Sequence, residues 1–260
     1  MKTRPLRAPA AWARPGLDPR IRNLTNALNL LSNKVMDHGL VATPDMSMGD
    51  VIAHCGTVVT GGDLNVFFSE GTWSFKEGYT INRPKVYFWG IPGATVFERH
   101  IDNTAPLLTL AGREVSISGI RFDDTAEDTE ATVKITGSRA VVSGCVFEDC
   151  FQAIEANGGT GIRILDNYVI SCRATTCAIN ITNNSTDGIV MANIIEQAGL
   201  SADICLDAGS ARWAIVGNQT FNGSIRYTDT DGHSEAGSPG AAAEEFVETE
   251  SEVVAREVFR

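Results

Sequence analysis

The sequence lacks an excess of basic charge and long apolar runs. Its 260 residues include 21 Lys and Arg against 32 Asp and Glu, a formal net charge of −11. This balance argues against binding to the phosphate backbone of nucleic acid. No apolar stretch approaches the roughly 20 residues of a membrane-spanning helix, and residues 1–16 lack the apolar core of a secretory signal. We therefore expect no nucleic-acid partner and no membrane insertion.

Aromatic residues are scarce, at 7% of the chain, whereas glycines number 25. This composition suits strands joined by turns better than helices. The six cysteines follow no metal-ligand spacing. Without a secretory signal, we expect all of them to be reduced thiols, and we expect no metal site and no cofactor apart from the calcium considered below.

One strand pattern returns about every 25 residues, and its anchor positions are Gly90, Gly119, Gly144, Asp166, Ala192 and Gly217. Two residues before each anchor stand apolar, mostly β-branched residues: Phe88, Ile117, Val142, Ile164, Val190 and Ile215. A second strand family keeps the same repeat: Leu108, Val133, Ile154, Ile179, Ile204 and Ile225. Two ladders in step predict coils stacked about 4.8 Å apart. The sequence therefore predicts an all-β protein, a single-stranded right-handed parallel β-helix over residues 45–230.

The position after the anchor holds asparagine in the last three coils, at Asn167, Asn193 and Asn218. We expect their side-chain amides to hydrogen-bond one another and the backbone at a turn inside the coil. By the same register, Cys150 and Cys172 stack on adjacent coils, and we expect this pair to stay reduced.

The segment VFFSEGTW at residues 66–73 resembles the opening strand and Gly-Thr-aromatic turn of pectate-lyase-like β-helix proteins. Residues 86–90, 162–167 and 213–218 are similar to the repeats of that superfamily. The resemblance covers about residues 45–230, and it implies a short helix over Ser47 to His54 that caps the N-terminal end. Because the superfamily contains lyases, hydrolases, epimerases, phage tailspikes and structural rods, the resemblance implies the fold and leaves the activity open.

Four carboxylates lie at matching offsets in neighbouring coils: Asp123, Asp124, Glu148 and Asp149. Enzymes of the superfamily that cut pectin-like polymers use clustered aspartates with an arginine, or aspartates that bind calcium. The resemblance thus implies acid/base cleavage or Ca²⁺ ligation here. The register places no His or Arg beside the cluster, and the Asn-Thr-Asp, Gly-His-Gly and Arg-x-Lys motifs of the hydrolases are missing. We therefore favour a solvated acidic turn over a catalytic site.

Several outward positions of the first strand family are apolar in the later coils: Leu165, Ile189, Met191 and Val216. Soluble monomers seldom leave such a patch in water, so we expect another copy of the chain or its own C-terminal segment to cover it. Between Asp18 and His38, a heptad spacing predicts an amphipathic helix with a seam of Ile21, Leu24, Leu28, Leu31 and Val35. This helix either joins copies or docks on its own rod.

These patterns divide the chain into an attachment arm at residues 1–44, the β-helix, and a Gly/Ser/Ala linker with an acidic tail at residues 231–260. Four aromatic residues are candidates for stacking on sugar rings: Trp73, Tyr79, Tyr87 and Trp89.

The expected function is that of a spike or fibre on a phage or phage-like particle, made in the host cytoplasm. We expect a homotrimer that contacts other capsid or tail proteins and binds cell-surface polysaccharide. Two alternatives stay open. One is a polysaccharide lyase or hydrolase, and the other is a capsid decoration protein without a glycan partner.

Overall fold

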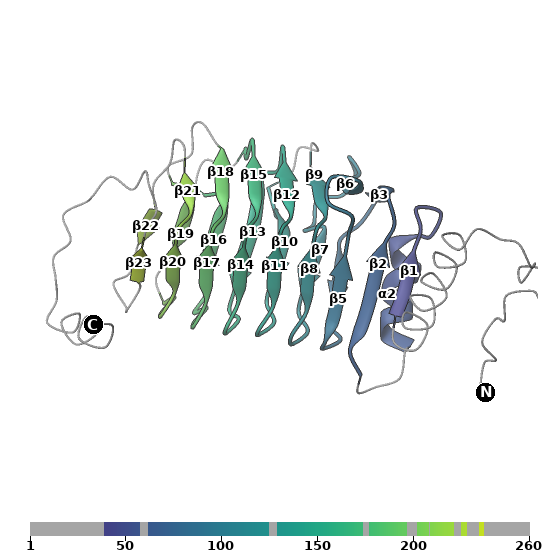
Figure 1. Ribbon diagram of the computed structural model, residues 1–260, viewed down its shortest axis with the longest axis horizontal. Coiled ribbons are helices and arrows are strands. Elements are labelled where there is room, and N and C mark those ends of the chain that lie inside the picture. Colours follow the sequence, from purple (N-terminus) through teal and green to yellow (C-terminus); the bar gives the residue numbers. More distant parts are fainter. Residues whose placement is uncertain are drawn as a thin grey trace, which may run out of the picture.

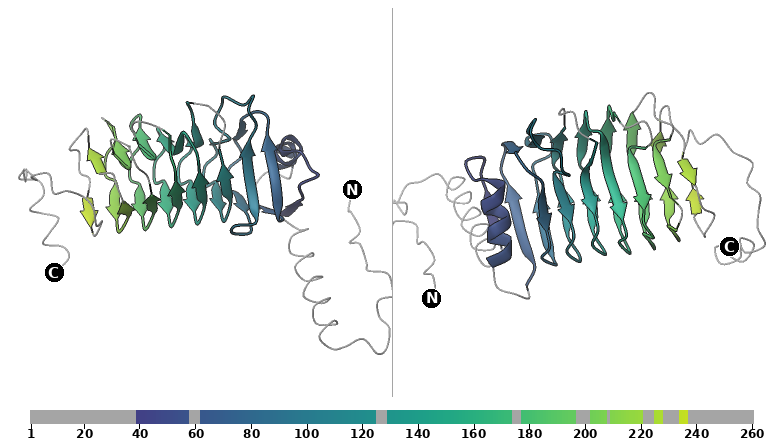
Figure 2. Two further views of the ribbon diagram at one scale, coloured as in Figure 1. Left: turned by 90° about the horizontal axis from the view of Figure 1, so that it is seen from above. Right: turned by 180° about the vertical axis from the view of Figure 1, so that it is seen from behind.

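The computed structural model describes residues 39–57, 62–124, 129–173, 177–196, 202–207, 209–220, 225–227 and 234–236. Successive strands of the chain are distributed over three sheets that run along a rod, and the strands described below pair in parallel (Figure 1). Views from above and behind show the same stacking of strands along the long axis (Figure 2). The parallel β-helix predicted from the repeat is confirmed.

The strands of the three sheets within the described residues are as follows. Sheet A has nine of them: β1 (Gly39–Ala42), β2 (Leu64–Phe68), β5 (Val86–Trp89), β8 (Ser116–Ser118), β11 (Val141–Ser143), β14 (Arg163–Leu165), β17 (Ile189–Met191), β20 (Ala214–Val216) and β23 (Ser234–Ala236). Sheet B has seven: β3 (Gly71–Phe75), β6 (Thr95–Arg99), β9 (Arg121–Asp123), β12 (Val146–Glu148), β15 (Tyr168–Ile170), β18 (Ile194–Glu196) and β21 (Gln219–Thr220). Sheet C has seven: β4 (Tyr79–Ile81), β7 (Leu108–Leu110), β10 (Ala131–Ile135), β13 (Gln152–Asn157), β16 (Ile179–Thr182), β19 (Ile204–Leu206) and β22 (Ile225–Tyr227).

Both predicted ladders are confirmed in register. In sheet A, the inward residues Phe88, Ile117, Val142, Ile164, Val190 and Ile215 pair in that order. In sheet C, Leu108, Val133, Ile154, Ile179, Ile204 and Ile225 do the same. Sheet B was not predicted as a sheet of its own. From β9 to β18 its strands are three residues long with one buried residue at the centre, so they are too short to show an alternating pattern.

A short helix, α2 (Met48–Thr57), covers the N-terminal end of the rod (Figure 1). The backbone N–H of Asp50 donates to Ser47 Oγ (3.1 Å), and that hydroxyl donates to Asp50 Oδ2 (2.7 Å). Ser47 therefore caps the first turn of the helix. Met48, Val51 and Cys55 are buried in the common core, so the expected helical cap is present.

The described strands extend beyond the expected limits of 45 and 230, because β1 pairs with β2 and β23 pairs with β20. The expected heptad helix lies outside the described residues. In the described part of the chain, no helix is long and apolar enough to cross a membrane.

The predicted asparagine ladder is present at the turn between sheets A and B. Asn167 Nδ2 donates to Asn193 Oδ1 (3.0 Å), and Asn193 Nδ2 donates to Asn218 Oδ1 (2.9 Å). Asn167 Nδ2 also donates to the carbonyl of Val142 (3.0 Å). The residues before the asparagines adopt positive φ, including Asp166 (53°), which turns the chain sharply and leaves backbone groups that the buried amides satisfy.

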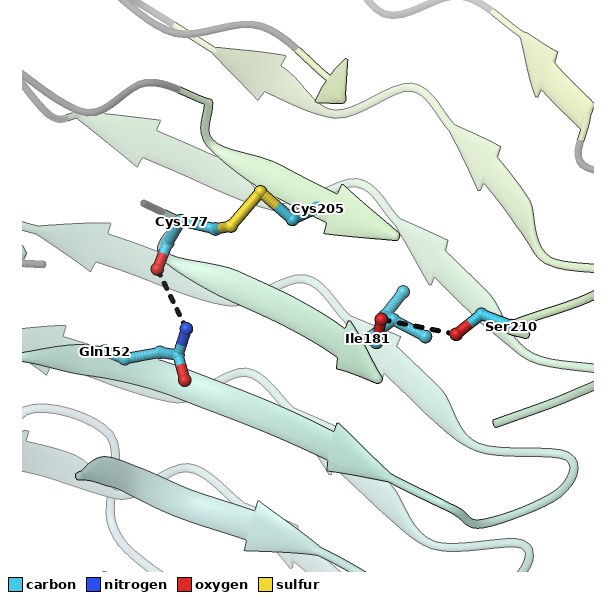
Figure 3. The surroundings of a disulfide bond; sticks show 5 residues. All are labelled: Gln152, Cys177, Ile181, Cys205 and Ser210. Atoms are coloured by element: carbon cyan, nitrogen blue, oxygen red, sulfur yellow. Dashed lines mark hydrogen bonds between the residues drawn. A yellow bond between two sulfur atoms is a disulfide. The ribbon is translucent and has the colours of Figure 1, made fainter. Parts of the chain in front are cut away.

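The cysteines depart in part from the sequence prediction. Cys177 and Cys205 form a disulfide with a Cα–Cα distance of 5.9 Å (Figure 3), so the expectation of six reduced thiols is wrong for this pair. Cys205 lies on β19, and Cys177 lies two residues before β16, the neighbouring strand of sheet C, so the disulfide links two adjacent coils. Cys150 and Cys172 are free thiols 3.1 Å apart on adjacent coils, as predicted.

Candidate functional surfaces

An acidic row runs along the outward face of sheet B. Glu98 pairs in register with Asp123, and Asp123 pairs with Glu148. The three carboxylates therefore project from consecutive strands that lie about 4.8 Å apart. The structure thus brings together Asp123 and Glu148, two of the four carboxylates singled out from the sequence.

Arg121 lies within this row, contrary to the expectation that no arginine stands beside the carboxylates. Its Nη2 bonds to Glu148 Oε2 and lies 3.9 Å from Asp123 Oδ2. The strand alternation explains its position, because a residue two places before Asp123 faces the same side of β9. All three side chains are about one third exposed, so this cluster is accessible to a ligand. Arg121 thus places a positive charge between the two carboxylates.

Asp124 does not belong to this surface, which corrects the expectation of an outward carboxylate. It is fully buried and forms a two-pronged ion pair with Arg99. Arg99 Nη2 donates to Asp124 Oδ2 (3.1 Å), and Thr132 Oγ1 donates to the same oxygen (2.6 Å). Arg99 Nη1 also donates to the carbonyl of Asn103 (3.2 Å). This network anchors the loop after β6 and keeps Asp124 away from any polymer on the surface.

Asp149, the fourth carboxylate, is exposed, and it follows the end of β12 with a φ of 50°. It lies past the outward row, on the corner between sheets B and C. In the described ranges, no group of three His, Cys, Asp or Glu side chains is placed to hold a metal ion.

A second surface lies on sheet A near the N-terminal end of the rod. Phe67 on β2 and Trp89 on β5 are in register and are 38% and 40% exposed. Asn65 and Tyr87 are in register on the same two strands, two residues earlier. Trp89 Nε1 donates to Asn65 Oδ1 (3.1 Å), which holds the indole in place. We call these four residues the aromatic platform.

Of the four aromatic residues predicted to stack on sugars, only Tyr87 and Trp89 belong to the aromatic platform. Trp73 is 3% exposed and packs edge-on against Phe68 and Phe97, at centroid distances of 5.3 and 5.9 Å. Burial in the core therefore rules out stacking of Trp73 on a sugar.

Tyr79 lies on sheet C beside the helical cap and is half-buried. Burial and then the nearby Glu77 carboxylate raise the pKa of Tyr79 above its ordinary value. It sits on a different sheet from Tyr87 and Trp89, so the three do not form one surface. Phe67 and Asn65 were not predicted as sugar-binding residues, although their alternation with the inward Val66 indicated an outward position.

The apolar outward positions predicted from the sequence also come together. Leu165, Met191 and Val216 are in register on β14, β17 and β20. Met191 is 37% exposed, and the other two are half-buried. Ile189 lies next to Met191 on the same face of β17, two residues earlier. We call these four residues the apolar patch. The seam residues Ile21, Leu24, Leu28, Leu31 and Val35 lie outside the described residues.

Comparison with known proteins supports the fold. No protein-family model and no curated protein matches the chain. The catalytic domain of a GH87 α-1,3-glucanase in complex with tetrasaccharides superimposes with a TM-score of 0.54 at 10% identity, over 77% of this chain and 38% of that domain. A pectin methylesterase in complex with a hexasaccharide gives a TM-score of 0.47 at 10% identity, over 74% and 67%. At this identity the likeness to the glucanase shows the parallel β-helix fold alone, and the chain spans about two fifths of that domain.

Proposed function

We propose that this chain is a polysaccharide-binding β-helix and that the aromatic platform is the surface that contacts sugar. The observation that carries the proposal is the pair of exposed rings, Phe67 and Trp89, in register beside the polar side chains of Asn65 and Tyr87. Aromatic faces bury the C–H face of a sugar ring, and adjacent amide and hydroxyl groups fix its orientation.

The geometry of the platform favours binding because it is ordered before a ligand arrives. Its residues alternate with Val66 and Phe88, which are fully buried. The indole N–H of Trp89 already has an acceptor. Little side-chain entropy is then lost when a sugar ring stacks on it.

We further propose that the chain acts as a spike or fibre of a phage-like particle, assembled from several copies. The apolar patch supports this, because water-exposed apolar rows are usually covered by another chain, and closed symmetric assemblies provide such a cover. In this proposal, residues 1–38 provide the attachment to capsid or tail proteins.

A second candidate function is cleavage of the bound polysaccharide. The observation that favours it is Arg121 between Asp123 and Glu148 on the outward face of sheet B. Because the two strands lie about 4.8 Å apart, the carboxyl groups are too close together for a water between them. One would therefore protonate the leaving oxygen while the other attacks the sugar, and water would then hydrolyse the glycosyl-enzyme. Arg121 would stabilise negative charge that develops on the substrate.

The first experiment measures binding of the full chain to a panel of bacterial and plant polysaccharides by affinity electrophoresis. We expect retardation by at least one polymer, and we expect Trp89→Ala to weaken it at least tenfold. Ile101→Ala removes a side chain that is 80% exposed in the loop after β6 and serves as the matched control. If no polysaccharide of the panel retarded the full chain or the Ile101→Ala control, the proposal would be refuted.

The same panel separates the second candidate. New reducing ends or unsaturated products that disappear in Asp123→Asn and Glu148→Gln would establish cleavage. Bound polymer that stays intact over long incubation would reject it and leave binding in place.

A further inference from the structure

The first five strands of sheet A contain no charged residue. Their sequences are GLVA in β1, LNVFF in β2, VYFW in β5, SIS in β8 and VVS in β11. Charged residues make up 20% of the chain, so a stretch of this size without one stands out. The next strand along the sheet, β14, begins with the exposed Arg163. The aromatic platform therefore lies within an uncharged area that covers five adjacent strands.

The charged residues just before these strands are engaged in ion pairs. Lys85 Nζ lies 3.6 Å from Asp63 Oδ1, ahead of β5 and β2. Glu114 Oε1 lies 3.1 Å from Arg139 Nη1 and 3.4 Å from Arg113 Nε, ahead of β8 and β11. A carboxylate or sulfate on a ligand would have to compete with Asp63 or Glu114 for these cations.

Neutral hydrogen-bonding groups continue the rows of the platform. Ser116 follows Tyr87 in register, and Ser118 follows Trp89. Ser143 Oγ lies next in the row and donates to Ser118 Oγ (3.4 Å). Burial, followed by the charges of Asp63 and Glu114, raises the pKa of Tyr87, so the phenol keeps its proton at neutral pH and can donate a hydrogen bond.

These groups suit hydroxyls and amides but not anions. An ionised group that leaves water without a cationic partner loses hydration that neutral hydroxyls do not replace. We infer that the aromatic platform takes an uncharged polysaccharide, whose sugar units carry hydroxyl or N-acetyl groups and no carboxylate, sulfate or phosphate. The inference rests on the proposed polysaccharide binding and adds the class of polymer.

The test uses pairs of polymers that share a backbone and differ in charge. Suitable pairs are dextran with carboxymethyl dextran, and methyl-esterified homogalacturonan with its de-esterified form, beside the neutral and anionic members of the wider panel. We expect the full chain to bind neutral polymers at least tenfold more tightly than anionic ones, with the neutral binding lost in Trp89→Ala.

Three other outcomes overturn the inference, and they are distinguishable. If the protein bound anionic polymers more tightly and Trp89→Ala weakened that binding, the proposed polysaccharide binding would stand and the inference of an uncharged polymer would be rejected. A panel blank for both classes rejects the proposed function as well. A blank panel together with a smaller assembly mass for Trp89→Ala by light scattering would assign the platform to contact between copies.

A gain-of-function variant tests the same argument from the opposite side. Ser118→Lys places a cation next to Trp89 in the row, on a residue that is half-buried. We expect it to strengthen binding of the anionic member of a pair several-fold while neutral binding changes little. If Ser118→Lys left the ratio of neutral to anionic binding unchanged, charge would not be the property by which the platform selects its ligand.

Discussion

Arg99 and Asp124 form a buried ion pair between the end of β6 and the corner that follows β9, and both side chains are fully inaccessible to solvent. Thr132 completes the coordination of the carboxylate, and backbone carbonyls of the loop after β6 accept from the guanidinium. Breaking such a pair by removing one partner leaves an uncompensated charge in the interior. The pair is therefore structural, and its loss should affect folding rather than ligand binding.

We predict that Asp124→Asn lowers the free energy of unfolding by about 3 to 5 kcal/mol, because it removes the carboxylate charge that pairs with the buried Arg99 guanidinium. Urea unfolding followed by circular dichroism measures this. Asp123→Asn is the matched control, since its partially exposed contact with Arg121 should cost less than about 1 kcal/mol. Equal effects of the two substitutions would contradict the structural role of Asp124.

The asparagine ladder gives a second stability prediction. Asn193 accepts from both the backbone N–H and the side chain of Asn167 and donates to Ile164 O and Asn218 Oδ1. Asn193→Ala leaves several of these buried groups unpaired, at about 1 to 3 kcal/mol for each, so we expect a total loss near 3 kcal/mol.

The control for this ladder is a surface pair of the same residue type. Asn183 Nδ2 donates to Asn157 Oδ1 (2.9 Å) where solvent can replace either partner. Asn157→Ala should therefore change the urea midpoint little. A loss as large as that of Asn193→Ala would show that burial of the amide is not the source of its contribution.

The cysteines give a third prediction, in alkylation. Burial raises the pKa of Cys145 to about 12 and that of Cys55 to about 11, and it raises the pKa of Cys150 well above its usual value. At pH 8 these pKa values lie above the pH, so the thiols stay protonated and unreactive, because the thiolate is the nucleophile. Cys172 is also buried, so we expect iodoacetamide to leave the native protein unmodified in intact-mass spectra.

After unfolding without reductant, we expect alkylation of the four free cysteines. After reduction, we expect alkylation of Cys177 and Cys205 as well. Six alkylated residues before reduction would contradict the Cys177–Cys205 disulfide. Two would show that Cys150 and Cys172 are also linked.

The repeat allowed both ladders to be predicted because stacking forces equivalent residues into register, so inward residues such as Ile117 and Val142 recur at matching positions. The same logic would have placed Trp73 and Asp124 inward. In β3 the polar Thr72 and Ser74 flank Trp73, and Asp124 lies two residues after the inward Phe122.

Other features depend on the paths of loops, which the period does not determine. Arg99 meets Asp124 only because the loop after β6 folds over them. Ile179 and Ile204 are register partners, but Cys177 lies two residues before Ile179 and Cys205 lies one residue after Ile204. Strand register alone therefore does not pair the two cysteines.

The apolar patch gives the last prediction, on assembly. If another copy covers it, a charge at its centre must be desolvated without a partner, and this costs several kcal/mol for each ion and weakens the interface. We therefore expect a trimer for the wild-type chain by light scattering and a monomer for the double variant Leu165→Asp, Met191→Asp. Ile101→Asp adds a carboxylate at a site that is 80% exposed and should leave the mass unchanged. A monomeric wild-type chain would remove the support for a multi-copy appendage. Sugar binding at the aromatic platform could still be tested on the monomer, because the platform and the apolar patch occupy different strands of sheet A.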